Sequence, residues 1–141
     1  MTRNQIGAGT ATLTVSTTPS ADWADFVTKQ SDGTIYHGLP WIGVAIEAFG
    51  CQAYFVEARS CNGDLVGVLP VVRQRSLLFG DRLTSLPYCN YGGPVASQHG
   101  IAERLMDSAV RLAVDIGVDC MEIRDCSPRV CLLYTSDAAD E

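Results

Sequence analysis

Two apolar stretches joined by an Asn-Gly pair constrain the fold more than any other feature of this sequence. The first stretch is 52–59 and the second is 65–73, and residues 61–64 between them read Cys-Asn-Gly-Asp. Asparagine and glycine adopt positive φ at low cost, so this pair is typical of a tight turn between antiparallel strands. A third extended stretch, 82–86, follows. The sequence therefore predicts a meander of antiparallel strands.

A strand and two helices are predicted before this meander. Residues 10–17 alternate and are rich in threonine and valine, which is typical of a strand. Apolar residues then recur every three or four positions in 21–29, and Ser20 or Asp22 would cap this helix. A second helix is predicted in 40–50, where a proline begins the segment and a glycine ends it.

One helix and one strand are predicted after the meander. Apolar residues share one helical face in 101–116, and Gly117 follows where the pattern ends. The stretch 120–124 alternates as a strand does, and the short loop before it favours parallel pairing. The predicted fold class is therefore α/β (α+β), with a mixed, mostly antiparallel sheet, flanking helices and the order β-α-α-β-β-β-α-β.

Composition favours a packed domain and argues against several kinds of partner. Of the 141 residues, 47% are hydrophobic and 18% are charged, so the chain has enough apolar surface to offset the entropy lost on folding. The formal charge of −6 argues against direct nucleic acid binding, which depends on Lys and Arg. No apolar run approaches the roughly 20 residues that span a bilayer, and the first residues lack the layout of a signal peptide. The expected location is the cytoplasm.

The cysteines lack the spacing of a metal site. They are Cys51, Cys61, Cys89, Cys120, Cys126 and Cys131. None forms a Cys-x-x-Cys pair or joins a His/Cys cluster, so we expect reduced thiols and no metal. Cys120 and Cys126 flank an extended segment that would hold them ~20 Å apart, which is too far for a disulfide.

The last residues, 131–141, read CLLYTSDAADE and do not continue the pattern of the domain. They look like the translation of a transposase adapter used in preparing sequencing libraries, and a natural C-terminal tail is the alternative. We therefore expect a flexible tail at 1–9, one domain at 10–130 and a non-native tail at 131–141, with the natural protein continuing beyond Val130. Without the strands that would follow, the edge of the final strand is expected to lie open and to favour aggregation.

Four stretches of the sequence carry a family resemblance. They are 36–41 (YHGLPW), 67–71 (GVLPV), 76–83 (SLLFGDRL) and 85–94 (SLPYCNYGGP). Together they resemble FemAB-related proteins of the GNAT superfamily, and especially the branch associated with exosortase and PEP-CTERM systems. The predicted element order is also that of the first part of a GNAT acyltransferase fold, so the resemblance implies a truncated GNAT-like domain. It extends over about 23–125, most of the chain.

The resemblance implies a parent protein with two GNAT-like units, of which this chain supplies most of the first. FemAB-type enzymes join an amino acid from aminoacyl-tRNA to an amine of a peptidoglycan precursor, and relatives use other donors such as acyl-CoA. The implied function is acyl transfer to a cell-envelope or exopolysaccharide amine, with this piece inactive without the missing unit. The alternative is a non-catalytic module that binds a substrate or a partner.

The resemblance also implies where a donor would bind. GNAT enzymes have a Gln/Arg-x-x-Gly-x-Gly/Ala loop, whose backbone amides at a helix N-terminus hold the pyrophosphate of coenzyme A. Gly100 and Ala102 fit this pattern, but Ser97 stands where Gln or Arg is expected. The loop is therefore a degenerate cofactor-binding site, and no cofactor is expected in this piece.

Candidate substrate-binding residues begin with the glycine-rich stretch of the resemblance. Tyr91, Gly92 and Gly93 would let the backbone approach a substrate closely, and a tight turn with a surface tyrosine is the alternative. His37 is a candidate base or substrate ligand, although a lone histidine is more often structural. Trp41 lies in the same stretch as His37, 36–41, and is a candidate for the substrate site or an anchor of its helix to the sheet.

Charged residues complete the set of candidates, and no residue is assigned a catalytic role. Arg73 lies with Arg75 and Arg82 around the connection between two strands, where they could face an anionic donor or a lipid-linked phosphate. Solvated strand ends are the alternative. Glu122 and Arg124 alternate on one face of the last strand and form a candidate polar pair in a cleft, or on a solvated or interdomain face.

Overall fold

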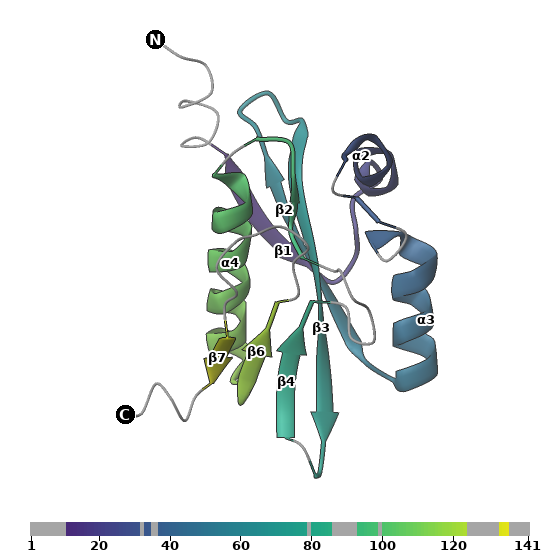
Figure 1. Ribbon diagram of the computed structural model, residues 1–141, viewed down its shortest axis with the longest axis vertical. Helices are drawn as coiled ribbons and strands as arrows, with labels where there is room; N and C mark the ends of the chain where they lie inside the picture. Colours follow the sequence, from purple (N-terminus) through teal and green to yellow (C-terminus); the bar gives the residue numbers. More distant parts are fainter. Residues whose placement is uncertain are drawn as a thin grey trace.

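The described part of the chain forms one mixed sheet with helices on both faces (Figure 1). The computed structural model describes residues 11–31, 33–34, 37–78, 80–85, 93–98, 100–123 and 133–135. Helices α2 (Trp23–Lys29) and α3 (Leu39–Phe49) lie on one face, and α4 (Ile101–Ile116) lies on the other. The strands are β1 (Thr12–Ser16), β2 (Gln52–Arg59), β3 (Leu65–Ser76), β4 (Gly80–Thr84), β5 (Val95–Ala96), β6 (Cys120–Glu122) and β7 (Leu133–Thr135).

The sheet has the strand order β1-β2-β3-β4-β6-β7, and β5 pairs with β3. Every pair is antiparallel except β4 with β6, which are parallel. The predicted fold class and the predicted order of elements are therefore confirmed, as is the parallel pairing of the strand after the long helix. The short strands β5 and β7 were not expected from the sequence.

Turn chemistry accounts for the two hairpins of the meander. Between β2 and β3, Gly63 has a φ of 88°, and the backbone N–H of Ser60 donates to the carbonyl of Asp64 (2.9 Å). This confirms the predicted turn. After the turn between β3 and β4, Gly80 has a φ of 82°. Gly80 is also the first residue of β4 and pairs with Ser76. The third strand therefore begins before the predicted 82–86.

The edge of β6 is paired rather than open. β7 pairs with it in antiparallel register, with Met121 opposite Tyr134. The expectation of an open edge at the final strand is therefore wrong, because an extended segment within reach satisfies the N–H and C=O groups that an edge strand presents. The adapter origin of 131–141 stays a prediction.

Strand β3 lies at the centre of the sheet and is buried on both sides. It pairs with β2 along most of its length, with β5 at Gly67 and Val68, and with β4 from Val72 onward. Pro70 lies in the interval between β5 and β4, where β2 is the one described strand that pairs with β3. A proline is normally excluded from a central strand because it has no N–H to donate, and here it lies where the pairing is one-sided.

The core is divided by the sheet into two apolar clusters. The cluster on the α4 face includes the fully buried Val56, Leu69, Leu83, Ile101, Leu105 and Met121. The cluster on the α2 and α3 face includes Trp23, Ile42, Phe55, Val68 and Val72, and the rings of Trp23 and Phe55 meet edge to face with centroids 5.1 Å apart. Gly67 lets α4 approach the first cluster closely. A Cβ there would lie 2.6 Å from Ile101 Cγ2 and 2.9 Å from Leu105 Cδ1.

Replacing Gly67 with alanine should therefore destabilise the protein. Ile101 and Leu105 are fully buried and have little room to move, so we expect a loss of about 1–3 kcal/mol in the free energy of unfolding. Urea denaturation measures it. Gly43→Ala is the matched control, because a Cβ at Gly43 meets nothing within 4 Å and alanine in a helix stabilises by about 0.5–1 kcal/mol. Equal effects of the two substitutions would contradict the prediction.

A polar network attaches the start of α2 to β2. The buried Glu57 accepts hydrogen bonds at Oε2 from the backbone N–H (2.9 Å) and the hydroxyl (2.8 Å) of Ser20. The same hydroxyl lies 2.9 Å from Asp22 Oδ1, so one proton serves two carboxylates. Arg59 binds both oxygens of Asp22, at 2.8 and 2.9 Å. The predicted side-chain cap of α2 is absent, because the carboxylate of Asp22 binds Arg59 instead.

This network predicts a pH-dependent contribution from Asp22. Its hydrogen bond with Arg59 holds the pKa of Asp22 well below its ordinary value of 3.8. A depressed pKa stabilises the folded state above the unfolded pKa, and that stability is lost as pH falls through the folded pKa. The destabilisation caused by Asp22→Asn should therefore be largest near neutral pH and shrink below about pH 4.

Urea denaturation of both proteins at neutral pH and at about pH 3 tests this prediction. The effect should be small, since the Asp22 side chain is 47% exposed and solvent screens the pair. Asp107→Asn, at an exposed position of α4, is the control. The same pH trend in both variants would remove the role assigned to Arg59.

Candidate functional site

A polar surface lies at the ends of the parallel strands β4 and β6. The register places Val72, Thr84 and Glu122 in one row across β3, β4 and β6, and residues directly opposite one another project from the same face of a sheet. Cys120 lies two residues before Glu122 and so shares this face. Val72 belongs to the cluster under α2 and α3, so these residues project from the face of the sheet that α2 and α3 cover. We refer to Thr84, Cys120 and Glu122 as the β4–β6 polar face.

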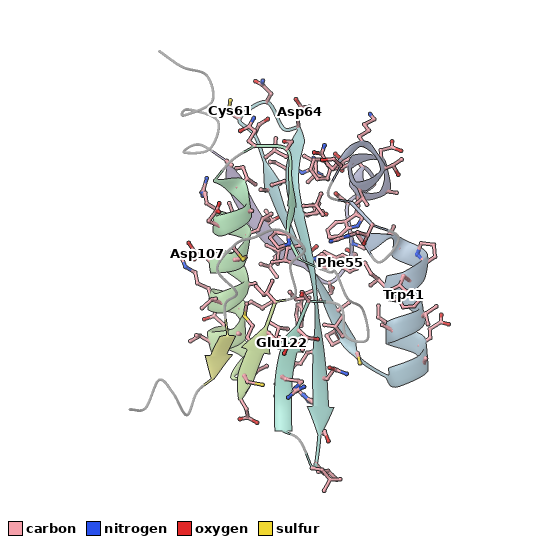
Figure 2. All side chains as sticks on the ribbon, in the orientation of Figure 1. Trp41, Phe55, Cys61, Asp64, Asp107 and Glu122 are labelled. Carbon is pink, nitrogen blue, oxygen red and sulfur yellow. The ribbon has the colours of Figure 1, made fainter. Side chains whose placement is uncertain are left out.

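The polar face lies beside the half of the sheet that the two short helices cover. Helix α3 packs against β2, and α2 packs against β3. Figure 2 shows Glu122 near the carboxyl ends of β4 and β6, with Trp41 farther across on α3. The same face of the sheet therefore changes from apolar under the helices to polar at β4 and β6.

Thr84 holds a buried hydroxyl without a partner. The residue is 4% exposed, and its Oγ1 makes no hydrogen bond to any residue that the structure describes. Buried hydroxyls are nearly always paired, and an unpaired one costs about 1–3 kcal/mol. The proton of this hydroxyl is therefore not committed to any residue that the structure describes.

Glu122 and Cys120 bring a carboxylate and a thiol to the same surface. Parallel strands end at the same edge of a sheet, and the backbone N–H of Ser85, just after β4, donates to the carbonyl of Glu122 (3.0 Å). Both side chains are half-buried, and Cys120 is a free thiol. A carboxylate can accept a proton, and a thiol is a weak nucleophile until it loses its proton. Together with Thr84, they provide a proton acceptor and a hydrogen-bond donor.

Sequence reasoning named Glu122 as a candidate but did not single out Thr84 or Cys120. Each strand shows only its own alternation, and nothing in the sequence states which residue of 80–84 lies opposite Glu122. The missing information is the register, which pairs Thr84 with Glu122. A parallel alignment of the two strands by their buried residues, Leu83 and Met121, would have given it.

The fold brings together His37 and Gly93, which are far apart in the sequence. The buried ring of His37 makes contact through both nitrogens. Nδ1 accepts from the backbone N–H of Thr34 (3.2 Å) and also lies 2.9 Å from its hydroxyl. An N–H can only donate, so the ring proton is on Nε2, which donates to the carbonyl of Gly93 (2.8 Å). The carbonyl of His37 in turn accepts from the indole of Trp23 (2.9 Å).

Two other candidates are placed away from the polar face. Trp41 is partly buried against the cluster under α2 and α3. Arg73 projects from the α4 face, where its Nε donates to Asp81 (2.9 Å) and its Nη2 donates to the carbonyl of Ile116 (3.3 Å). The hydrogen bond from Arg73 holds the pKa of Asp81 below its ordinary value. Arg73 and Glu122 therefore lie on opposite faces of the sheet.

The remaining candidates divide between described and undescribed parts of the chain. Tyr91, Gly92 and Arg124 lie outside the described residues. Within the described ranges, no three His, Cys, Asp or Glu side chains gather into a metal site. The helices of that same part are all too short or too polar to cross a bilayer.

The loop before α4 provides backbone amides, but the described residues Ser97 and Glu103 are unsuited to a pyrophosphate. Gly100 has a φ of 90° and leaves α4 without a side-chain cap, and Ala102 is buried in the first turn. Ser97 is committed to β3, since its N–H and hydroxyl both bond to the carbonyl of Val66. Glu103 adds a negative charge to the first turn, where an anionic ligand would otherwise be favoured. These residues do not fit the pyrophosphate of coenzyme A.

Comparison with known proteins gives a structural likeness but no family. No family model matches the chain, and no curated protein does. Among solved structures, it is similar to a GCN5-related glucosamine N-acetyltransferase region in a fungal multi-domain GH3 β-N-acetylglucosaminidase, with 21% identity and a TM-score of 0.48. The likeness covers 84% of this chain and 14% of the length of that protein.

The contacts of His37 predict a role in stability. His37→Phe keeps an aromatic ring at this position but removes its bonds to Thr34 and Gly93, so we expect a loss of about 2 kcal/mol in the free energy of unfolding. Thermal and urea denaturation measure the loss. Thr34→Val removes only the bond from the hydroxyl and should cost less. An unchanged stability of His37→Phe would show that the ring is not a structural link.

Proposed function

We propose that this chain is the first part of a GNAT-like acyltransferase and that the β4–β6 polar face forms one wall of its acceptor cleft. The observation that carries the proposal is that Thr84 and Glu122 lie opposite each other at the carboxyl ends of two parallel strands. The buried hydroxyl of Thr84 has no hydrogen-bond partner among the described residues. The sequence stretches that resemble FemAB-related proteins support it. So does the element order, which is that of the first part of a GNAT fold.

The chemistry of amide formation gives each of these groups a role. A neutral amine attacks an activated carbonyl, a C–N bond forms, and negative charge develops on the carbonyl oxygen. The carbonyl then re-forms as the bond to the leaving group breaks, which is the C–S bond of acyl-CoA or the ester C–O bond of aminoacyl-tRNA. The carboxylate of Glu122 accepts the proton that the nitrogen loses and returns it to the leaving group. The hydroxyl of Thr84 donates a hydrogen bond to the developing oxyanion. Cys120 has no assigned step.

The finer parts of the proposal come from the FemAB-like resemblance. The parent protein has a second GNAT-like unit, and its acceptor is an amine of a cell-envelope or exopolysaccharide precursor in the cytoplasm. The donor is acyl-CoA or an aminoacyl-tRNA. Since the residues around Gly100 and Ala102 do not fit coenzyme A, we assign donor binding to the second unit, and this chain is inactive without it.

A second candidate function is a binding module without transfer activity. It is favoured by the loop before α4, where Ser97 is bonded to β3 and Glu103 opposes an anion. In that case the polar face would bind an amine without transferring an acyl group to it. Both candidates use the same surface, so activity of the intact protein separates them.

The test begins with the intact protein, obtained by reading the source DNA beyond the Val130 codon. Transfer to amine acceptors is then measured with acyl-CoA and with aminoacyl-tRNA as donors. Glu122→Gln should lower kcat/KM by about a hundredfold, which is the usual effect of losing a general base. Glu47→Gln, on the exposed side of α3, is its control. Equal activity of the two variants would remove Glu122 from the mechanism.

Thr84→Val provides a second readout, in which stability and activity change in opposite directions. The variant should lose about tenfold or more in kcat, because one donor to the oxyanion is gone. It should unfold at the same or a higher temperature, since an unpaired buried hydroxyl becomes a methyl group of similar shape. Thr28→Val, at an exposed position of α2, is the control. A destabilised Thr84→Val would show that the hydroxyl has a structural partner.

A further inference from the structure

The turn between β3 and β4 presents two adjacent leucines to solvent. Leu77 is 107% exposed and Leu78 is 87% exposed, whereas the other exposed large apolar side chains of the described residues are 37–56% exposed. Single exposed apolar residues are ordinary on protein surfaces. Two neighbouring leucines with almost no contact to the rest of the protein are unusual and mark a surface that meets an apolar environment.

The hairpin carries these leucines beyond the rest of the sheet. β3 pairs with β2 only as far as Arg73 and continues to Ser76, and β4 pairs with it from Gly80. The end of the hairpin is therefore two-stranded. Figure 1 shows this turn at one end of the molecule, beyond the ends of α3 and α4. The leucines can thus contact an external surface without a steric clash between that surface and either helix.

Arginines surround the turn, although the chain as a whole is acidic. Arg75 and Arg82 are exposed, and the alternation of the strands places them on opposite faces of the hairpin. Arg73 neutralises Asp81, and Asp119 Oδ2 accepts a hydrogen bond from the backbone N–H of Asp81 (3.0 Å). Three arginines and two aspartates leave one net positive charge, whereas the whole chain carries −6. Charges more than about 10 Å away are largely screened by salt.

We infer that the β3–β4 turn is a peripheral membrane contact, in which Leu77 and Leu78 enter the interface of an anionic phospholipid bilayer. Arg75 and Arg82 then bind headgroup phosphates on either side. Apolar side chains at an exposed tip with flanking basic residues are the combination that interfacial binding uses. A second protein fits the turn less well, since two side chains cover far less area than a stable protein interface needs.

This contact does not depend on acyl transfer, because it uses none of Thr84, Cys120 and Glu122. It would place the protein at a membrane surface whatever reaction it catalyses. Failure of vesicle binding and failure of acyl transfer are therefore separate results.

Co-sedimentation of the chain with vesicles tests the inference. Vesicles of equal parts phosphatidylglycerol and phosphatidylcholine should bind the protein, and those of phosphatidylcholine alone should bind it weakly. Added salt should reduce binding to the anionic vesicles. Leu77→Ser/Leu78→Ser should lower the partition coefficient about tenfold. Arg75→Gln/Arg82→Gln should lower it about fivefold for each arginine.

The control variants change exposed residues elsewhere on the chain. Val44→Ser/Val114→Ser removes two exposed apolar side chains from helices, and Lys29→Gln/Arg111→Gln removes two exposed positive charges. Both should bind anionic vesicles as the unchanged protein does, and thermal melts should show that all variants are folded.

Three results would overturn the inference. The unchanged protein could fail to bind anionic vesicles, the hairpin variants could bind as well as it does, or the control variants could lose as much. If the leucine variant altered only self-association in sedimentation velocity, the turn would be a contact between two copies rather than with lipid.

Discussion

Burial of β3 on both faces and at both edges is the constraint on which the other elements depend. All the residues from Val66 to Val72 are buried, with α4 against one face and α2 against the other. The strand can satisfy its backbone only through β2, β5 and β4, and this fixes their positions. The absence of a Cβ at Gly67 lets α4 pack close to β3. Pro70 is accommodated in the interval between the residues that pair with β5 and those that pair with β4.

Local chemistry predicted most of the fold. The Asn62-Gly63 turn, the helix 101–116 and its end at Gly117 are confirmed because short-range preferences and long-range packing agree there. Prediction was wrong where a distant partner decided the outcome. Arg59 took the carboxylate expected to cap α2, and residues 133–135 paired with an edge expected to be open. Neither partner can be identified from a window of neighbouring residues.

The candidate site was less predictable than the fold, for the same reason. Glu122 was named as a candidate because a charged residue within an apolar strand is visible in the sequence. Thr84 was missed because a threonine in a strand is ordinary until its hydroxyl is known to be buried and unpaired. His37 was named as a candidate base or substrate ligand with a structural role as the alternative, and its contacts with Thr34 and Gly93 depend on how two connections meet. Arg73 carries the charge expected at a site but projects to the other face.

The parallel pairing of β4 with β6 also bears on the order in which the chain folds. The two strands are adjacent in space but separated in sequence by β5 and α4, and closing such a long connection is entropically costly before the contact forms. The hairpin of β2 and β3 needs only a short turn. The polar face is therefore expected to form later than this hairpin, so a ligand that binds it would hold closed a non-local junction of the domain and stabilise the whole against unfolding.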